Sequence, residues 1–143
     1  MKLKEKLSVD KKSFLEPYDV LLSTIGNFDK VSIFPTDMKG NWIYHQSIFR
    51  IRFKENQQDN AVAFVMFLMS HAGKAVIEKI QVGSKVKSIS KKSLSVIKIP
   101  RFTPDIKKQS RTLFNKEIKM IQKIVELSAS IEELRNSYLK KLE

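Results

Sequence analysis

A chain of 143 residues has room for one domain and an extension, but not for two full domains. Its 27 basic and 15 acidic side chains give a formal charge of +12, which favours a polyanionic partner: nucleic acid first, and an anionic membrane second. The absence of cysteine excludes disulfides and thiolate metal sites. The longest apolar run, residues 61–69, has about half the length that crosses a bilayer. We therefore expect a cytoplasmic protein.

Three short strands are expected in the first half of the chain. Residues 19–23 and 30–34 are largely apolar, and the segment between them contains Gly26 and further turn formers, so we expect a hairpin. Residues 48–53 alternate apolar side chains with Arg50 and Arg52, as a half-buried strand does. The two arginines are expected to need no contact beyond water.

Helices follow the third strand. Asn60 is expected to cap a helix that runs to about Ser70, and Ser70 to cap a second helix that runs through Ile80. Residues 90–94 read as a short helical turn after a polar loop. Residues 96–99 are expected to form a last strand, closed by a proline that cannot donate a hydrogen bond to a sheet.

One long helix is expected after this strand. Thr103 can accept hydrogen bonds from the free N–H groups of its first turn, Pro104 suits the first helical position, and Asp105 complements the positive end of the helix dipole. At about 1.5 Å per residue the helix would reach roughly 60 Å. The sequence therefore predicts an α+β fold: a small mixed sheet domain with packed helices in residues 1–103, followed by one long carboxy-terminal coiled-coil helix in residues 104–143.

Apolar residues recur along this helix at coiled-coil spacing. They step by four and three positions alternately, which keeps them on one narrow stripe and favours pairing with a partner helix. This seam consists of Met120, Ile124, Leu127, Ile131, Leu134 and Tyr138. The alternative is that the stripe lines the core of a helical bundle, but the polar faces beside it favour pairing. A shorter second stripe is expected to pack against the globular domain: Leu113, Phe114, Ile118, Ile121 and Val125.

No catalytic, metal-binding or cofactor-binding site is expected. His45 and His71 are far apart in the sequence and have no acidic residues at metal-ligand spacing, and the four glycines form no phosphate-binding loop. Asp105, Glu117 and Lys119 fit the loose pattern of metal-dependent nucleases. That chemistry needs the acid and the lysine side by side on a strand, whereas here all three residues fall in one predicted helix.

Two polar clusters are candidates for DNA binding. The first mixes lysines, which neutralise phosphates, with serines, which can hydrogen-bond to phosphates or bases: Ser84, Lys85, Lys87, Ser88, Lys91 and Lys92. The alternative is an ordinary solvated loop. The second cluster offers donors able to read base edges: Lys39, Asn41, Tyr44, His45 and Gln46. Trp42 lies among them, and Trp42 and Tyr44 are equally compatible with a place in the core.

Several segments of the chain also follow one another in an order that is typical of one protein family. They are residues 18–26 and 30–33, Gln46-Ser47, Arg50-Ile51-Arg52, residues 67–70, Gly83-Ser84, Ile89-Ser90, Leu94, residues 97–100, Gln109 and the long helix. In this order and spacing, residues 16–143 resemble the target recognition domain and conserved-region helix of type I restriction-modification DNA specificity subunits.

The resemblance implies a subunit without catalytic residues or cofactor that carries DNA sequence recognition for a methyltransferase and nuclease assembly. In this family each recognition domain reads half of a split double-stranded DNA target. The long helices pair antiparallel, set the distance between the halves and bind the methylation subunits, with which the restriction subunits assemble.

The chain departs from the family pattern in two respects. It carries one recognition domain and one helix instead of two, which suggests a half-subunit that forms a homodimer. It also lacks the family's first strands, so the recognition domain is expected to be shortened at its start. The alternative function is therefore a truncated, non-reading fragment that pairs with a specificity or methylation subunit and modulates it.

Overall fold

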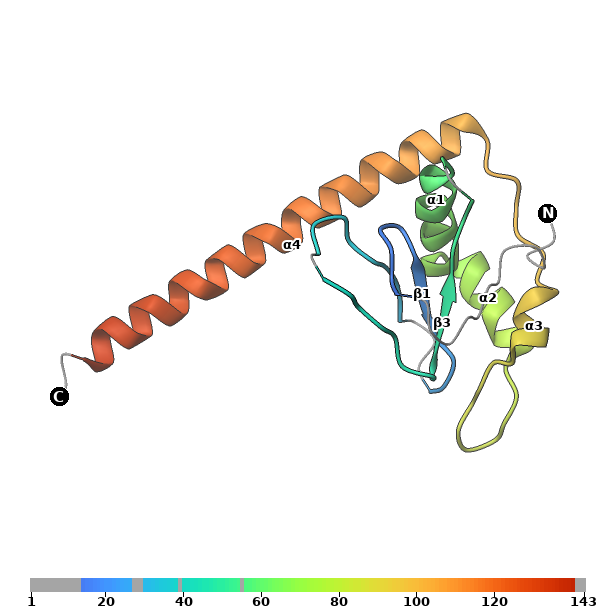
Figure 1. Cartoon of the computed structure of the whole chain (residues 1–143), viewed down its shortest axis with the longest axis horizontal. Helices are drawn as coiled ribbons and strands as arrows, with labels where there is room; N and C mark the ends of the chain where they lie inside the picture. Colours follow the sequence, from blue (N-terminus) through green and yellow to red (C-terminus); the bar gives the residue numbers. More distant parts are fainter. Residues whose placement is uncertain (1–13, 27–29, 39, 55, 141–143) are drawn as a thin grey trace. The chain divides into compact units, whose positions relative to one another are not determined.

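The computed structural model describes residues 14–26, 30–38, 40–54 and 56–140. The chain divides into two compact units, Met1–Ser110 and Arg111–Glu143, and each is described by itself (Figure 1). The described part of the first unit holds three strands and three helices, together with the start of a fourth helix that continues through the second unit.

The centre of the first unit is a three-stranded sheet made of β1 (Val20–Ser23), β2 (Val31–Ile33) and β3 (Ile48–Ile51). Strand β1 lies in the middle and is antiparallel to both neighbours, so the expected hairpin of β1 and β2 is confirmed. The sheet was expected to be mixed, but both of its pairings are antiparallel. The physical reason is that turns and loops join these strands, whereas a parallel pair needs a long crossover, usually a helix.

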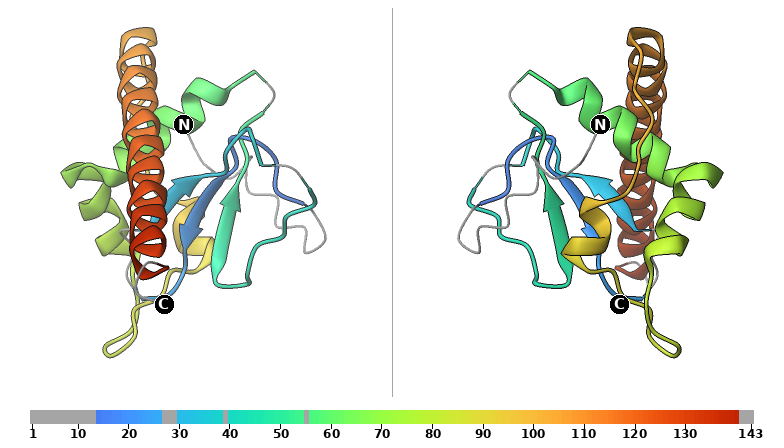
Figure 2. Two further views of the ribbon diagram at one scale, coloured as in Figure 1. Left: turned by 90° about the vertical axis from the view of Figure 1, so that its left-hand side faces the viewer. Right: turned by 90° about the vertical axis from the view of Figure 1, so that its right-hand side faces the viewer.

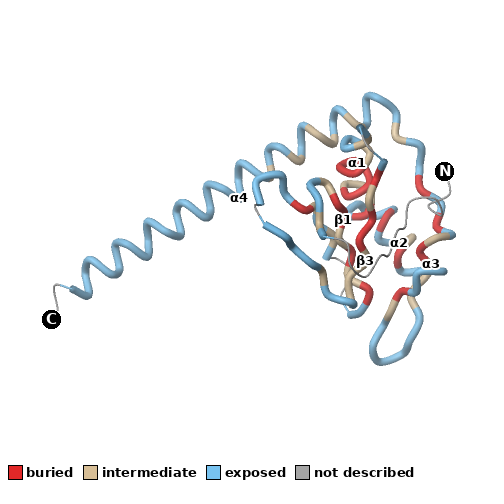
Figure 3. The backbone as a smooth tube through the Cα atoms, viewed as in Figure 1, coloured by how far each residue is buried: buried red, intermediate tan, exposed pale blue. Residues whose placement is uncertain are grey.

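The two faces of the sheet are covered differently. Side chains alternate along a strand, so Val20 and Leu22 share one face, whereas Leu21 lies on the other face with its cross-strand partner Arg50. The Val20 and Leu22 face belongs to the main core, together with buried residues of the helices. Figure 3 shows the buried positions gathered between the strands and these helices.

Two helices follow the sheet, α1 (Gln58–Met69) and α2 (His71–Ile80), and meet at a bend of 79°. Ser70 caps α2 as expected, because its Oγ accepts a hydrogen bond from the Gly73 N–H at 3.2 Å. The prediction that Asn60 caps α1 was wrong. Helix α1 begins at Gln58, and the Asn60 amide lies within the first turn, where it donates to the side-chain oxygen of Gln57 at 3.2 Å.

The short helix α3 (Lys91–Ser95) is the expected helical turn, and Ser90 caps it by accepting from the Ser93 N–H at 3.0 Å. The strand expected at residues 96–99 is absent. Val96 ends α3 in a helical conformation and only Lys98 forms a β-bridge, while Ile97 and Ile99 are buried in the core. The two buried isoleucines therefore hold this stretch against the core, although it does not join the three-stranded sheet.

The fourth helix, α4 (Pro104–Leu139), confirms the long helix and with it the α+β class. Thr103 Oγ1 accepts from the Ile106 N–H at 3.3 Å, which is the predicted N-terminal cap. None of the residues of α4 is buried. Among the described residues, no single helix has both the length and the apolarity needed to cross a membrane, and α1 with α2 meets that criterion only as a bent pair.

Candidate nucleic-acid interface

Three segments that are far apart in the sequence meet around Thr24, at the end of β1. The backbone N–H of Thr24 donates to the carbonyl of Ser47 at 2.8 Å, and the Thr24 carbonyl accepts from the N–H of Ile89 at 3.0 Å. Thr24 thus joins the chain before β3 to the chain before α3. We call these three segments the sheet-end platform: residues 23–26, 45–47 and 82–89.

The third segment of the platform is a narrow loop whose two ends are bonded to each other. Val82 and Ser88 exchange two backbone hydrogen bonds, of 3.0 and 2.8 Å, and the Gly26 N–H donates to the Lys87 carbonyl at 3.0 Å. The residues between Val82 and Ser88 are exposed, and the loop projects from the rest of the first unit in Figures 1 and 2. This loop carries Ser84, Lys85 and Lys87 of the first predicted cluster.

Gly83 is required by the shape of this loop. Its φ of +111° lies in a backbone region that residues other than glycine rarely adopt. A Cβ built at this position would come within 2.3 Å of the Val86 carbonyl oxygen. The backbone at the tip therefore folds back onto Gly83, and this close contact fixes the conformation of the loop.

The remaining lysines of the first cluster adjoin the platform. Lys91 and Lys92 form the exposed start of α3, two and three residues after the Ile89 that is bonded to Thr24. The three platform segments contain no acidic residue, and neither do residues 90–101. These segments therefore carry a net positive charge; Asp29, in the turn between β1 and β2, lies outside the described residues.

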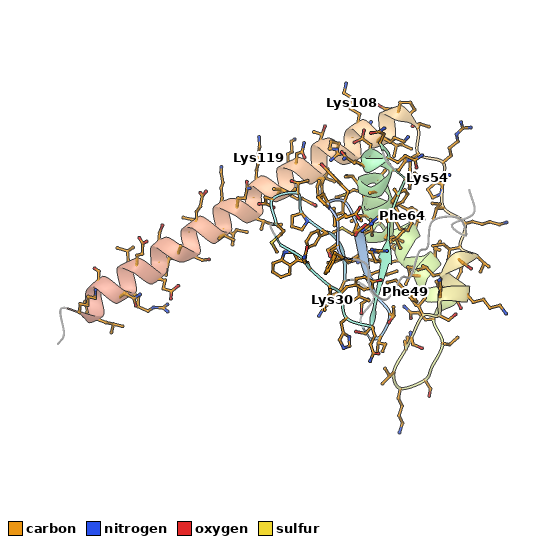
Figure 4. The ribbon with its side chains drawn as sticks, in the orientation of Figure 1. Lys30, Phe49, Lys54, Phe64, Lys108 and Lys119 are labelled. Carbon is orange, nitrogen blue, oxygen red and sulfur yellow. The ribbon has the colours of Figure 1, made fainter. Side chains whose placement is uncertain are left out.

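Lys30 is a further cation at this end of the sheet, and it was missed in the sequence. Its carbonyl accepts from the Ser23 N–H at 3.3 Å, which places Lys30 beside the last residue of β1, and its side chain is exposed. In Figure 4 Lys30 lies at one end of the sheet and Lys54 at the other. The hairpin pattern could have identified it, because the residue before β2 must lie opposite the end of β1.

His45 and Gln46 of the second predicted cluster also belong to the platform. The His45 ring accepts a hydrogen bond at Nδ1 from the Ser47 N–H at 3.2 Å, and Ser47 Oγ lies 2.7 Å from the same nitrogen. An N–H always donates, so Nδ1 is the acceptor and the neutral ring carries its proton on Nε2. Nε2 is then the group that can donate to a phosphate or a base.

The rest of the second cluster lies elsewhere. The Trp42 carbonyl accepts from the Leu15 N–H at 2.7 Å, so Asn41 and Trp42 run beside the start of the described chain. The Tyr44 ring is half-buried under the Arg50 guanidinium, 5.6 Å from its centre, and helps to cover the second face of the sheet. Lys39 lies outside the described residues.

The prediction that Arg50 and Arg52 need only water was wrong. Arg50 is 1% exposed and donates to the Phe14 carbonyl at 3.2 Å. Arg52 donates to both carboxylate oxygens of Asp19 and also pairs with Glu16. The hydrogen bond to Asp19 is the main cause that raises the pKa of Arg52, against the lowering effect of its burial. Both arginines therefore fix residues 14–19 to the sheet.

The predicted seam of α4 lies on the surface of the helix. Its six residues, Met120, Ile124, Leu127, Ile131, Leu134 and Tyr138, are between 57% and 70% exposed. This leaves the apolar stripe available to a partner, whereas a stripe within a completed bundle core would be covered. The packing of the second stripe against the globular part stays a prediction.

The nuclease pattern does not form a site. Asp105, Glu117 and Lys119 all lie in α4, and twelve positions along a helix separate the two carboxylates by about 18 Å. Asp105 instead accepts a hydrogen bond from the Gln109 amide at 2.8 Å. In the part of the chain that the structure describes, no group of three or more histidine and acidic side chains is arranged to hold a metal ion.

No protein-family model matches this chain, and no curated protein matches it either.

Proposed function

We propose that this chain is a non-catalytic, cytoplasmic DNA-recognition subunit of a type I restriction-modification system, or half of such a subunit. The observation that carries the proposal is the sheet-end platform, where Lys30, the 82–88 loop and the start of α3 place cations around Thr24 without a carboxylate among them. Such a surface matches the evenly spaced phosphates of a DNA duplex.

The platform also offers groups that can read bases. Ser84, His45 and Gln46 are exposed and can donate hydrogen bonds, while the lysines around them neutralise phosphates. Hydrogen bonds to bases distinguish DNA sequences, whereas contacts between lysines and phosphates fix the position of the protein on the duplex. The combination supports recognition of a DNA sequence over simple attraction to charge.

The exposed seam of α4 supports pairing with a second copy of the chain. The seam is symmetric about Ala129, so an antiparallel copy places Met120 against its Tyr138, Ile124 against its Leu134 and Leu127 against its Ile131. Ser128 and Ser130 lie beside the centre of the seam, where small uncharged side chains let two helices approach without repulsion.

A homodimer of this kind has a two-fold axis, so its two domains would read a symmetric, interrupted site. The methylation and restriction subunits of the same system would be its protein partners, and they would supply the chemistry. The chain itself is proposed to carry no catalytic residue and no cofactor.

The test is a titration of the full chain against duplex DNA over a series of salt concentrations, followed by co-expression with candidate methylation subunits and sequencing of the methylated sites. Binding that weakens with salt yet prefers one sequence, together with methylation at an interrupted symmetric site, is the expected result. Salt-dependent binding without sequence preference and without methylated sites would instead support the non-reading fragment that pairs with another subunit.

A further inference from the structure

The tip of the 82–88 loop places an apolar side chain between two cations. Val86 is more than half exposed and lies between Lys85 and Lys87 in the sequence. Val82, at the base of the loop, and Ile25, which bridges to Ser88, are also more than half exposed. This end of the sheet therefore presents three apolar side chains to water as well as the lysines of the loop.

The loop is held in one shape before any partner binds. The paired hydrogen bonds between Val82 and Ser88 close its base, and the Val86 carbonyl packs onto Gly83 at its tip. The bond from Gly26 to the Lys87 carbonyl ties one side of the loop to the sheet-end platform. A contact made by Val86 therefore costs little ordering of the chain, which is the condition for a specific contact.

The width of the loop selects the groove that it can enter. Two antiparallel stretches of chain run from its base to its tip, like a very short β-ribbon. The major groove of B-DNA, about 12 Å wide, admits a two-stranded ribbon, whereas the minor groove, about 6 Å wide, is too narrow. The loop therefore fits the major groove.

The chemistry of the tip selects the bases. A lysine ammonium only donates, and in the major groove guanine presents two acceptors, N7 and O6. Thymine is the base that presents a methyl group there, which is the contact that an exposed valine can make. Lys85 and Lys87 flank Val86, so the same exposed loop tip carries both kinds of side chain.

From this arrangement we infer that the 83–87 loop enters the major groove and reads a guanine next to a thymine, with Val86 in contact with the thymine methyl group. The inference rests on the proposed function, because it assumes that the chain binds duplex DNA. It adds the groove, the bases and the residue that distinguishes thymine.

The experiment begins with selection of binding sites from random duplex DNA by the full chain. The selected half-site is then remade with deoxyuridine in place of each thymine, which removes only the methyl group, and with 7-deazaguanine in place of each guanine. At one thymine, deoxyuridine should weaken binding by the unchanged protein on the order of fourfold, the value of one buried methyl group. Val86→Ser should bind the two DNAs equally, and Val82→Ser, at the base of the loop, should still distinguish them.

The outcomes separate the inference from the proposed function. If the chain selects no site, the proposed function fails and the inference fails with it. If it selects a site that lacks guanine beside thymine, or if Val86→Ser still distinguishes thymine from deoxyuridine, the inference is overturned and DNA recognition stands. The inference is also overturned if Val86→Ser loses binding to phosphatidylserine vesicles while its preference for the selected DNA is unchanged, because the loop would then serve a membrane. Thermal unfolding of each variant checks that the fold is kept.

Discussion

Arg52 donates two hydrogen bonds of 2.7 Å to the carboxylate of Asp19, one from Nε to Oδ1 and one from Nη2 to Oδ2. Asp19 is fully buried, and its Oδ2 also accepts from the Glu16 N–H at 2.8 Å. The pair joins the residue before β1 to the residue after β3, and so ties residues 14–19 to the end of the sheet farther from the platform.

Removal of one partner of this pair should destabilise the fold strongly. Asp19→Ala removes the buried carboxylate that accepts from the half-buried Arg52 guanidinium and from the Glu16 N–H, and we expect the free energy of unfolding to fall by about 2 to 3 kcal/mol. Urea denaturation measures this change. Glu16→Gln alters the more exposed partner of the same arginine and should cost under about 1 kcal/mol; equal losses for both variants would contradict the ranking.

The same pair should be insensitive to alkaline pH. Asp19 raises the pKa of Arg52, and a group whose pKa is raised on folding contributes stability below its unfolded pKa and loses it only as the pH rises through the folded value. Both values are strongly alkaline for arginine. The difference in unfolding free energy between Asp19→Ala and the unchanged protein should therefore stay constant from neutral to moderately alkaline pH.

Gly83→Ala should damage the loop more than the matched change at Gly26. Both residues have positive φ, +111° and +80°, but a Cβ at Gly83 meets the Val86 carbonyl at 2.3 Å, whereas at Gly26 it meets nothing within 4 Å. We expect Gly26→Ala to cost about 1 kcal/mol and Gly83→Ala about 2 to 3 kcal/mol, with weaker DNA binding only for the latter. Thermal unfolding and fluorescence anisotropy with labelled duplex DNA measure the two effects.

The salt dependence of DNA binding should report which lysines contact phosphates. Each phosphate that is no longer neutralised lowers the slope of log K against log salt by about 0.9, so Lys85→Ala with Lys87→Ala should lower it by up to about 1.8 and Lys30→Ala by about 0.9. Lys54→Ala is the control, because Lys54 lies at the opposite end of the sheet (Figure 4). A slope that falls equally for Lys54→Ala and Lys30→Ala would mean that the binding surface is not the sheet-end platform.

The direction of helix pairing can be measured by disulfide cross-linking, because the natural chain has no cysteine. In the antiparallel dimer Met120 faces the second copy's Tyr138, so Met120→Cys mixed with Tyr138→Cys should form a cross-linked dimer on oxidation. Neither variant should cross-link alone, since equivalent residues would be about 27 Å apart. Cross-linking of each variant with itself would instead indicate a parallel pair.

Polar substitution in the seam should dissociate the dimer. Ile124→Glu removes an apolar contact from each copy and places a carboxylate in the interface, so the dissociation constant should rise on the order of a hundredfold. Sedimentation velocity at several concentrations measures it. Gln122→Glu, about 200° around the helix from Met120, is the control that should leave the dimer intact; a monomer that neither change affects would refute the pairing proposal.

The sequence predicted the parts of the fold that depend on neighbouring residues. The caps at Ser70 and Thr103 were correct because a serine or threonine contacts a backbone N–H three residues later. The partners of Arg52 could not be predicted, since Asp19 lies 33 positions away. The same limit applies to the predicted binding clusters, because only the fold brings Ser47, next to the second cluster, and Ile89, next to the first, together at Thr24.

Almost all of the hydrogen bonds that hold the platform segments together around Thr24 are made by backbone groups. Every residue has a backbone carbonyl that can accept a hydrogen bond, and every residue except proline has an N–H that can donate one. These hydrogen bonds therefore do not depend on which side chains the platform carries. Substitutions at Ser84, Lys85, Val86 and Lys87 can accumulate, or be introduced together as one exchanged segment, while Gly83 and the bonded ends keep the scaffold unchanged. Under the proposed function, new DNA specificities could then arise on one constant framework.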